Sequence, residues 1–212
     1  MLSLLMDGQI GVVVMLIGTI VFSLTLHEFG HAYSAKLLGD NTAEQAGRLT
    51  INPVAHIDPM GLLMVVLIGF GYAKPVPFNP RNTHVPWASA AIGAAGPFAN
   101  LLIAIVSINI YVWAGRTGAF NLEGGLGVVL VMLAQINLLL MIFNLIPLGP
   151  LDGHYIMSWL LPKHLSFQYD RFNYRYGNYL FIGLILLSIV GVPIFRFVMN
   201  FASILLPYLI VF

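Results

Sequence analysis

An uncharged apolar run extends from Gly8 to Leu26 and leads directly into His27. A helix advances about 1.5 Å per residue, so His27 would lie roughly 25 Å along the axis from Ile10. The hydrocarbon core of a bilayer is about 30 Å thick. The run therefore predicts a membrane-spanning helix over about 8–38, with His27 inside the bilayer but close to one membrane face.

Composition extends this conclusion to the whole chain. Of 212 residues, 59% are hydrophobic and only 8% are charged, whereas soluble domains carry roughly 25% charged residues. We expect one integral-membrane domain over 1–212 in contact with lipid. The net charge of +1 gives no argument for a nucleic-acid partner. Without cysteine, disulfides, thiolate metal sites and a cysteine nucleophile are excluded.

The residues that follow the run form the pattern His-Glu-x-x-His. On a helix His27 and His31 project from one face, so both imidazoles can hold one metal ion. Glu28 is rotated away by one position, where it can reach a metal-bound water without being a ligand. A catalytic zinc takes three protein ligands, so the rest of the chain must supply the third.

Two further stretches are long and apolar enough to span a membrane, Trp87–Ala114 and Gly125–Leu145. The stretch 61–71 is too short to span and predicts a re-entrant or membrane-edge hairpin. Alternation over 46–53 predicts a short strand. The proline-rich stretch 72–86 predicts an ordered, extended surface segment.

The fold class predicted is an all-α polytopic membrane protein. A three-helix catalytic core over about 8–161 precedes C-terminal membrane helices over about 176–212. The stretch 176–190 is read as a fourth span, and 194–212 as either a fifth span or a helix at the interface. The sequence leaves the oligomeric state and this last choice open.

Basic residues set the orientation, because cytoplasmic loops are enriched in Lys and Arg. With the first helix entering from outside, Arg116 and Arg196 fall on the outer side. Seven of the nine basic residues fall on the side where that helix ends: Lys36, Arg48, Lys74, Arg81, Lys163, Arg171 and Arg175. The end of the first helix then lies near the cytoplasm.

The third span ends on that same side, at a Pro-x-x-Pro break, and Asp152 follows at once. Topology therefore brings Asp152 to the depth of His27 and His31, and an aspartate inside a membrane is costly unless it has a function. We expect one zinc ion on His27, His31 and Asp152, since two imidazoles and a carboxylate suit zinc better than magnesium or calcium. Asp152 could instead cap the helix that follows it.

These residues predict hydrolysis of a peptide bond, with Glu28 as general base. Asn144 is a candidate for the oxyanion or for holding substrate backbone, although a helix-packing bond is an equal alternative. Leu49 and Asn52 are substrate candidates, because a strand edge near Leu49 could bind an unwound substrate segment. The alternative function is a proton- or metal-coupled transporter that uses the same buried groups as a relay.

The chain resembles the site-2 protease family of intramembrane zinc metalloproteases. The resemblance rests on 27–31 and 144–153, and on 52–61, 74–77 and 95–100, which are similar to the compact bacterial and archaeal branch without a PDZ or nucleotide-sensing domain. It implies zinc on two histidines and an aspartate, a glutamate base, a prokaryotic cell membrane, and a transmembrane segment of another protein as substrate.

Three other residues are weaker candidates. His56 and Asp58 read first as residues that fix a loop, and second as parts of a gate or of the surroundings of the site. His154 stands where a glycine is common in the family, so it adds an imidazole of unassigned role.

Overall fold

The structure is a computed structural model that describes residues 2–68, 71–192 and 194–211. Within these residues the chain is mostly helical and contains no sheet. The α-helices are α1 (Leu2–Met6), α2 (Ile10–Leu37), α3 (Thr42–Gln45), α4 (Pro59–Ile68), α5 (Ala88–Thr117), α6 (Gly125–Asn144), α7 (Gly153–Leu160), α8 (Lys163–Ile189) and α9 (Ile194–Leu205); the short 3-10 helices are η1 (Pro53–Ala55), η2 (Pro80–Asn82) and η3 (Leu206–Leu209).

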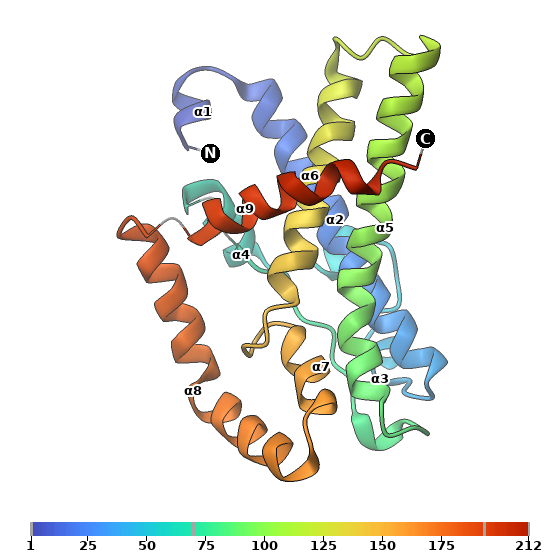
Figure 1. Cartoon of the computed structure of the whole chain (residues 1–212), viewed down its shortest axis with the longest axis vertical. Helices are drawn as coiled ribbons and strands as arrows, with labels where there is room; N and C mark the ends of the chain where they lie inside the picture. Colours follow the sequence, from blue (N-terminus) through green and yellow to red (C-terminus); the bar gives the residue numbers. More distant parts are fainter. Residues whose placement is uncertain (1, 69–70, 193, 212) are drawn as a thin grey trace.

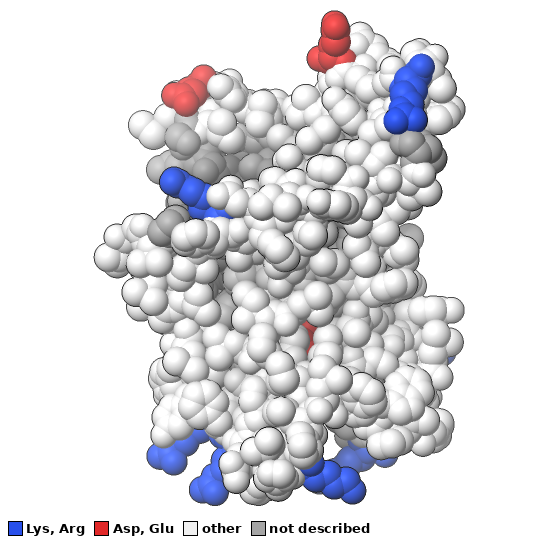
Figure 2. Space-filling view, viewed as in Figure 1, with Lys and Arg blue, Asp and Glu red and all other residues white. Residues whose placement is uncertain are grey.

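Three of the described helices are long and apolar enough to cross a membrane, as predicted: α2, α5 and α6. Helix α5 packs against both of the others, and α2 also packs against α6, so the three form one bundle (Figure 1). Figure 2 shows charged side chains at the two ends of the molecule and a broad uncharged belt between them, with an acidic surface visible in a recess of that belt. This distribution is that of a membrane protein.

Small and polar residues hold the bundle together where hydrophobic burial gives no advantage over lipid. A Cβ on Gly30 of α2 would lie 2.8 Å from the carbonyl oxygen of Ala95 in α5, so glycine permits this close approach. The Asn137 side-chain amide of α6 donates to the Ser23 hydroxyl of α2 at 2.7 Å, and both residues are buried. These contacts fix α2 relative to both neighbours.

The break after α6 turns the chain back toward the bundle. Helix α6 ends at Asn144, and α7 begins only at Gly153, where a Cβ would lie 2.3 Å from the carbonyl oxygen of Leu145. Helix α8 stabilises this turn, because Asn173 accepts a hydrogen bond from the Gly149 amide at 3.1 Å and the Tyr169 hydroxyl donates to the Pro147 carbonyl at 2.8 Å.

The proline-rich segment 72–86 is extended over 72–79, as predicted, but it forms η2 at 80–82, and Asp40 holds it against the end of α2. The Asp40 carboxylate is fully buried and accepts hydrogen bonds from the Asn79 amide at 2.5 Å, the Asn82 side chain at 2.9 Å and the Thr42 amide at 3.0 Å. Burial alone would raise the pKa of Asp40, but these hydrogen bonds outweigh it and lower that pKa below its usual value.

One sequence prediction about the fold is wrong. Residues 46–53 form no strand; they lie as a turn and irregular chain, because no partner strand is available, and the described residues contain only an isolated antiparallel bridge between Ile57 and Ala73. The stretch 163–175, for which the sequence predicted no element, is helical, so α8 begins at Lys163. The fourth span expected over 176–190 falls in α8, which is not among the three described helices that are long and apolar enough to span, so that prediction is not confirmed.

The last helix, α9, has 12 residues, and η3 continues it to Leu209. This stretch is among the shorter apolar helices and not among the three described helices that are long enough to cross a membrane. It crosses α6 instead of running parallel to it (Figure 1), and Ala202 packs against Ala104 and Leu138. Helix α4 likewise has only 10 residues and does not span.

The buried Asp40 carboxylate makes stability depend on pH. Because its folded-state pKa is lowered, its contribution is complete above the unfolded-state pKa of about 3.9 and is lost as the pH falls below that value. We expect Asp40→Asn to lower the free energy of unfolding at pH 7 by about 1.5–3 kcal/mol and to flatten the loss of thermal stability below about pH 4. Asp7→Asn, at an exposed carboxylate, is the control; equal melting curves for wild type and Asp40→Asn would contradict this assignment.

Candidate metal centre

Three side chains from distant parts of the chain meet beside the C-terminal half of α2. His27 and His31 lie one turn apart, with their Nε2 atoms 3.1 Å from each other, and both are buried. The Asp152 carboxylate lies between α6 and α7, with Oδ2 3.2 Å from His27 Nε2 and Oδ1 3.3 Å from His31 Nε2. The structure thus brings together the three residues whose meeting the topology predicted.

The outer nitrogens of the two imidazoles determine which atoms face inward. His31 Nδ1 donates to the Ile92 carbonyl at 2.6 Å, and His27 Nδ1 donates to Asn100 Oδ1 at 2.8 Å. Each ring therefore carries its proton on Nδ1 and presents an unprotonated Nε2 to the centre. Two nitrogen lone pairs and a carboxylate then face one another, and Asp152 Oδ2 is buried with no hydrogen-bond donor.

Such a cluster of acceptors can hold a cation, and its dimensions fit zinc. Tetrahedral ligands at about 2.0–2.2 Å from zinc are separated from each other by about 3.3–3.6 Å. The three ligand atoms offered here all lie within 4.8 Å of one another, with the closest pairs at 3.1–3.3 Å. Nitrogen and carboxylate donors in this number suit zinc and leave a position for water.

Gly96 on α5 provides the room for the two rings. A Cβ at this position would lie 2.3 Å from His31 Nε2 and 2.7 Å from His27 Cε1, inside the metal-facing side of the cluster. The residues predicted from sequence did not include a role for Gly96 or for Asn100. The sequence offered one signal for Asn100, since a buried asparagine in an apolar span is costly unless it has a hydrogen-bond partner.

Asp152 also stands at the N-cap position of α7, as the alternative interpretation proposed. Its side chain makes no capping hydrogen bond, however, and points to the two imidazoles. Capping is therefore not what holds this carboxylate in place.

Glu28 lies beside the cluster and outside the group of candidate ligands. Its side chain is buried, and Oε2 accepts a hydrogen bond from the backbone amide of Val76 at 3.0 Å. The segment 72–86 thus contacts the carboxylate through its backbone. The sequence did not indicate this contact.

The substrate candidates are not among the three candidate ligands, and each makes contacts of its own. Asn144 donates back to the Leu140 carbonyl of its own helix at 3.0 Å, which is a helix-internal bond. Leu49 packs against Ala32, Ala43 and Val76 and presents no strand edge. Asn52 accepts from the Val54 amide at 3.1 Å and caps η1. The preformed strand edge expected near Leu49 is therefore absent.

The two loop candidates fix local structure. His56 is buried and its Nε2 donates to the Thr50 carbonyl at 2.7 Å, which leaves Nδ1 as an acceptor. Asp58 accepts from the Gly61 amide at 2.9 Å at the start of α4. Neither touches the three candidate ligands.

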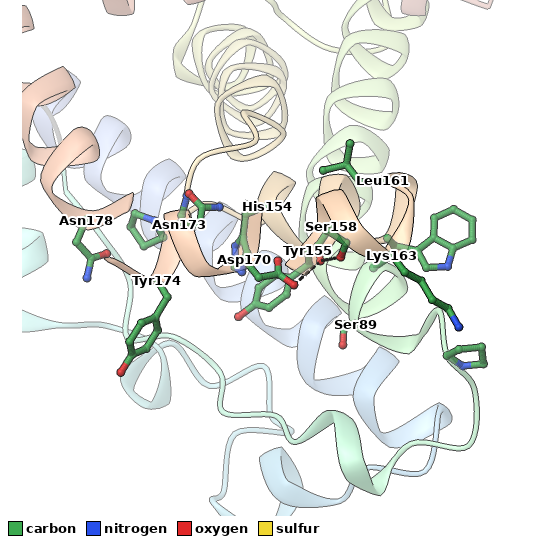
Figure 3. Close-up of a pocket in the computed structure, with 16 residues that line it drawn as sticks. Ser89, His154, Tyr155, Ser158, Leu161, Lys163, Asp170, Asn173, Tyr174 and Asn178 are labelled. Atoms are coloured by element: carbon green, nitrogen blue, oxygen red, sulfur yellow. Dashed lines mark hydrogen bonds between the residues drawn. The ribbon is translucent and has the colours of Figure 1, made fainter. Parts of the chain in front are cut away.

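His154 faces a separate cavity of about 860 Å³ between α7, α8 and the start of α5 (Figure 3). Its Nδ1 donates to the Leu151 carbonyl at 2.9 Å, and its ring lies against Tyr155. One turn further along α7, Ser158 donates to Asp170 of α8 at 2.9 Å. The residues that line this cavity do not include the histidines of α2, so His154 is not a fourth ligand.

Comparisons with known proteins agree with this chemistry. Over 151 residues the chain is 40% identical to the Bacillus subtilis protein named "Putative zinc metalloprotease YwhC", and the match covers 69% of each chain. It is 31% identical over 173 residues to the Mycolicibacterium smegmatis protein named "Putative zinc metalloprotease Rip2", covering 77% of this chain and 62% of that protein.

A third relative is archaeal. The chain is 30% identical over 145 residues to "Zinc metalloprotease MJ0392" of Methanocaldococcus jannaschii, covering 68% of this chain but only 34% of that longer protein. No family model and no solved structure matches the chain. The names of the relatives imply zinc as cofactor, and His27, His31 and Asp152 offer a fitting set of donors. The chain belongs to the zinc metalloprotease family that includes YwhC of Bacillus subtilis.

Proposed function

We propose that this chain is an intramembrane protease of the site-2 type, which cuts a peptide bond in or beside a transmembrane segment of another membrane protein. The observation that carries this proposal is the position of the donor cluster. His27 and His31 belong to a helix that is apolar enough to span a membrane, so the reacting bond must come to the membrane-embedded bundle. The resemblance of 27–31 and 144–153 to that family supports the same assignment.

His27, His31 and Asp152 would hold the ion in this proposal. Bound zinc supplies a Lewis acid that polarises the scissile carbonyl and lowers the pKa of a water molecule. Glu28 takes the proton from that water and returns it to the leaving amine. The Val76 amide occupies Oε2 of Glu28, which leaves Oε1 for the proton. Asn144 stays a candidate for the oxyanion, because its helix-internal bond to Leu140 uses only Nδ2.

The proposed active site lies near the cytoplasmic face of a multi-pass protein in a prokaryotic cell membrane. Basic side chains gather at the lower end of the molecule, below the uncharged belt (Figure 2), and cytoplasmic ends are enriched in such residues. A transmembrane helix has its peptide groups hydrogen-bonded internally, so a substrate must unwind locally before attack. Nothing in the fold or among the relatives favours the transporter alternative.

The space left by Gly96 gives a test of the zinc site. Gly96→Ala places a methyl group against both imidazoles, and we expect the purified protein to lose most of its zinc, measured by inductively coupled plasma mass spectrometry. Gly18→Ala is the matched control, because a Cβ on Gly18 of the same bundle meets nothing within 4 Å. Full zinc content in Gly96→Ala with intact folding would rule out metal binding between these rings.

The role of Glu28 is tested by the isosteric change Glu28→Gln. A general base contributes about 10²–10⁴-fold to rate, so cleavage of a labelled single-span membrane peptide in proteoliposomes should fall by at least that range. Zinc content should stay at the wild-type level, because Glu28 is not among the candidate ligands. Glu123→Gln, at an exposed residue before α6, is the control. Undiminished cleavage by Glu28→Gln would refute the proposed mechanism.

A further inference from the structure

An extended segment, Ala73–Asn79, crosses the end of α2 that carries Glu28; we call it the strap. Three groups of contacts hold it in place. The Lys74 amide donates to the His56 carbonyl at 2.8 Å, the Val76 amide donates to Glu28 at 3.0 Å, and the Asn79 amide donates to Asp40 at 2.5 Å. Of these hydrogen bonds, the one from the Val76 amide is to Glu28, the proposed general base.

Arg48 is the buried cation behind the strap. Only 5% of its surface is exposed, and it forms no salt bridge with an acidic residue among the residues described. Its guanidinium donates to two successive carbonyls of the strap, that of Lys74 and that of Pro75, the latter at 3.0 Å. His56 Nδ1 lies 3.4 Å from Arg48 Nη2 and accepts on the same side.

One peptide group joins this cation to Glu28. The Pro75 carbonyl and the Val76 amide belong to the same planar peptide group. Arg48 donates to the oxygen of this group, and the N–H of the same group donates to Glu28. A cation at the carbonyl polarises the unit and strengthens the N–H as a donor. Prolines at 75 and 77 restrict the backbone on both sides. The bridge is therefore short, rigid and polar.

The electrostatics of Arg48 agree with this connection. Burial lowers the pKa of Arg48, and the negative charge of Glu28 opposes that effect. A buried guanidinium without a carboxylate partner is costly. Here Nη1 and Nη2 of Arg48 donate to the strap, Nε is buried without a partner, and the negative charge that opposes the effect of burial is the carboxylate of Glu28 at the other end of the bridge.

We propose that Arg48 is a positioning residue for Glu28 and acts through the single peptide group between Pro75 and Val76. The inference rests on the proposed function, because it requires Glu28 to act as the base. In this scheme the strap takes part in catalysis, because its Val76 amide fixes Oε2 of Glu28. The free Oε1 therefore keeps the same orientation in every turnover. Arg48 touches neither the ion nor the substrate in this scheme.

The test is a double-mutant cycle. Arg48→Gln removes the charged guanidinium, and Val76→Pro removes the N–H that donates to Glu28. Misplacing a catalytic group by about 1 Å can cost about 10²-fold, so we expect each variant to lower kcat on the labelled single-span peptide by about 10–100-fold. KM and zinc content should stay unchanged. Combining the two should cause no further loss, because both break one path.

Matched variants separate this role from a loss of folding. Arg48→Lys keeps the charge and should restore part of kcat, and Arg81→Gln, at an exposed arginine beyond the strap, should keep it all. Val76→Pro should lose at least about tenfold more kcat than Val76→Ala, which loses side-chain packing but keeps the N–H. If Arg48→Gln fails to fold, Arg48→Lys takes its place in the cycle.

Several results would overturn the inference. Fully additive losses in kcat, or a rise in KM with kcat unchanged, would show that Arg48 does not act through the peptide bridge. Loss of zinc in Arg48→Lys would assign it a structural role. Glu28→Gln separates a failure of the proposed function from a failure of the positioning role. If Glu28→Gln still cleaves, the proposed function fails. If Glu28→Gln is inactive and the Arg48 variants are fully active, only the positioning role fails.

Discussion

Three potential ligand atoms converge in an apolar bundle, and their arrangement suits a cation between them. The Nε2 atoms of His27 and His31 have no proton, because their Nδ1 atoms donate outward to Asn100 and to the Ile92 carbonyl. Without an ion these lone pairs and the Asp152 carboxylate would repel one another at 3.1–3.3 Å. A bound ion would relieve this repulsion and couple metal binding to the stability of the centre.

The rest of the structure serves to bring these atoms together. Helix α5 supplies the two outward acceptors and, at Gly96, the space for the rings. The break after α6 carries Asp152 back into the bundle, and α8 holds that break through Asn173 and Tyr169. The strap donates a backbone hydrogen bond to Glu28. Ligands and proposed base are therefore oriented by different elements, so each can be perturbed separately.

The sequence predicted what hydropathy and helical spacing determine. The three spans, the shared face of His27 and His31, and the arrival of Asp152 at the same depth follow from apolar runs and chain direction alone. The sequence did not predict α8 from Lys163, because its first half is a polar surface helix with no apolar run to reveal it. The strand expected over 46–53 failed since alternation specifies a strand only where a partner exists. The bridge from Arg48 to Glu28 runs through backbone, which no residue pattern encodes.

The most direct measurement of the centre is zinc K-edge X-ray absorption on the purified protein and on Asp152→Cys. The wild type should give two imidazole nitrogens at about 2.0–2.1 Å with oxygen neighbours at about 2.0–2.2 Å. The chain contains no cysteine, so in Asp152→Cys a sulfur neighbour at about 2.3 Å can come only from position 152. A zinc ion that keeps its wild-type ligands in Asp152→Cys, with no sulfur neighbour, would contradict a centre built from His27, His31 and Asp152.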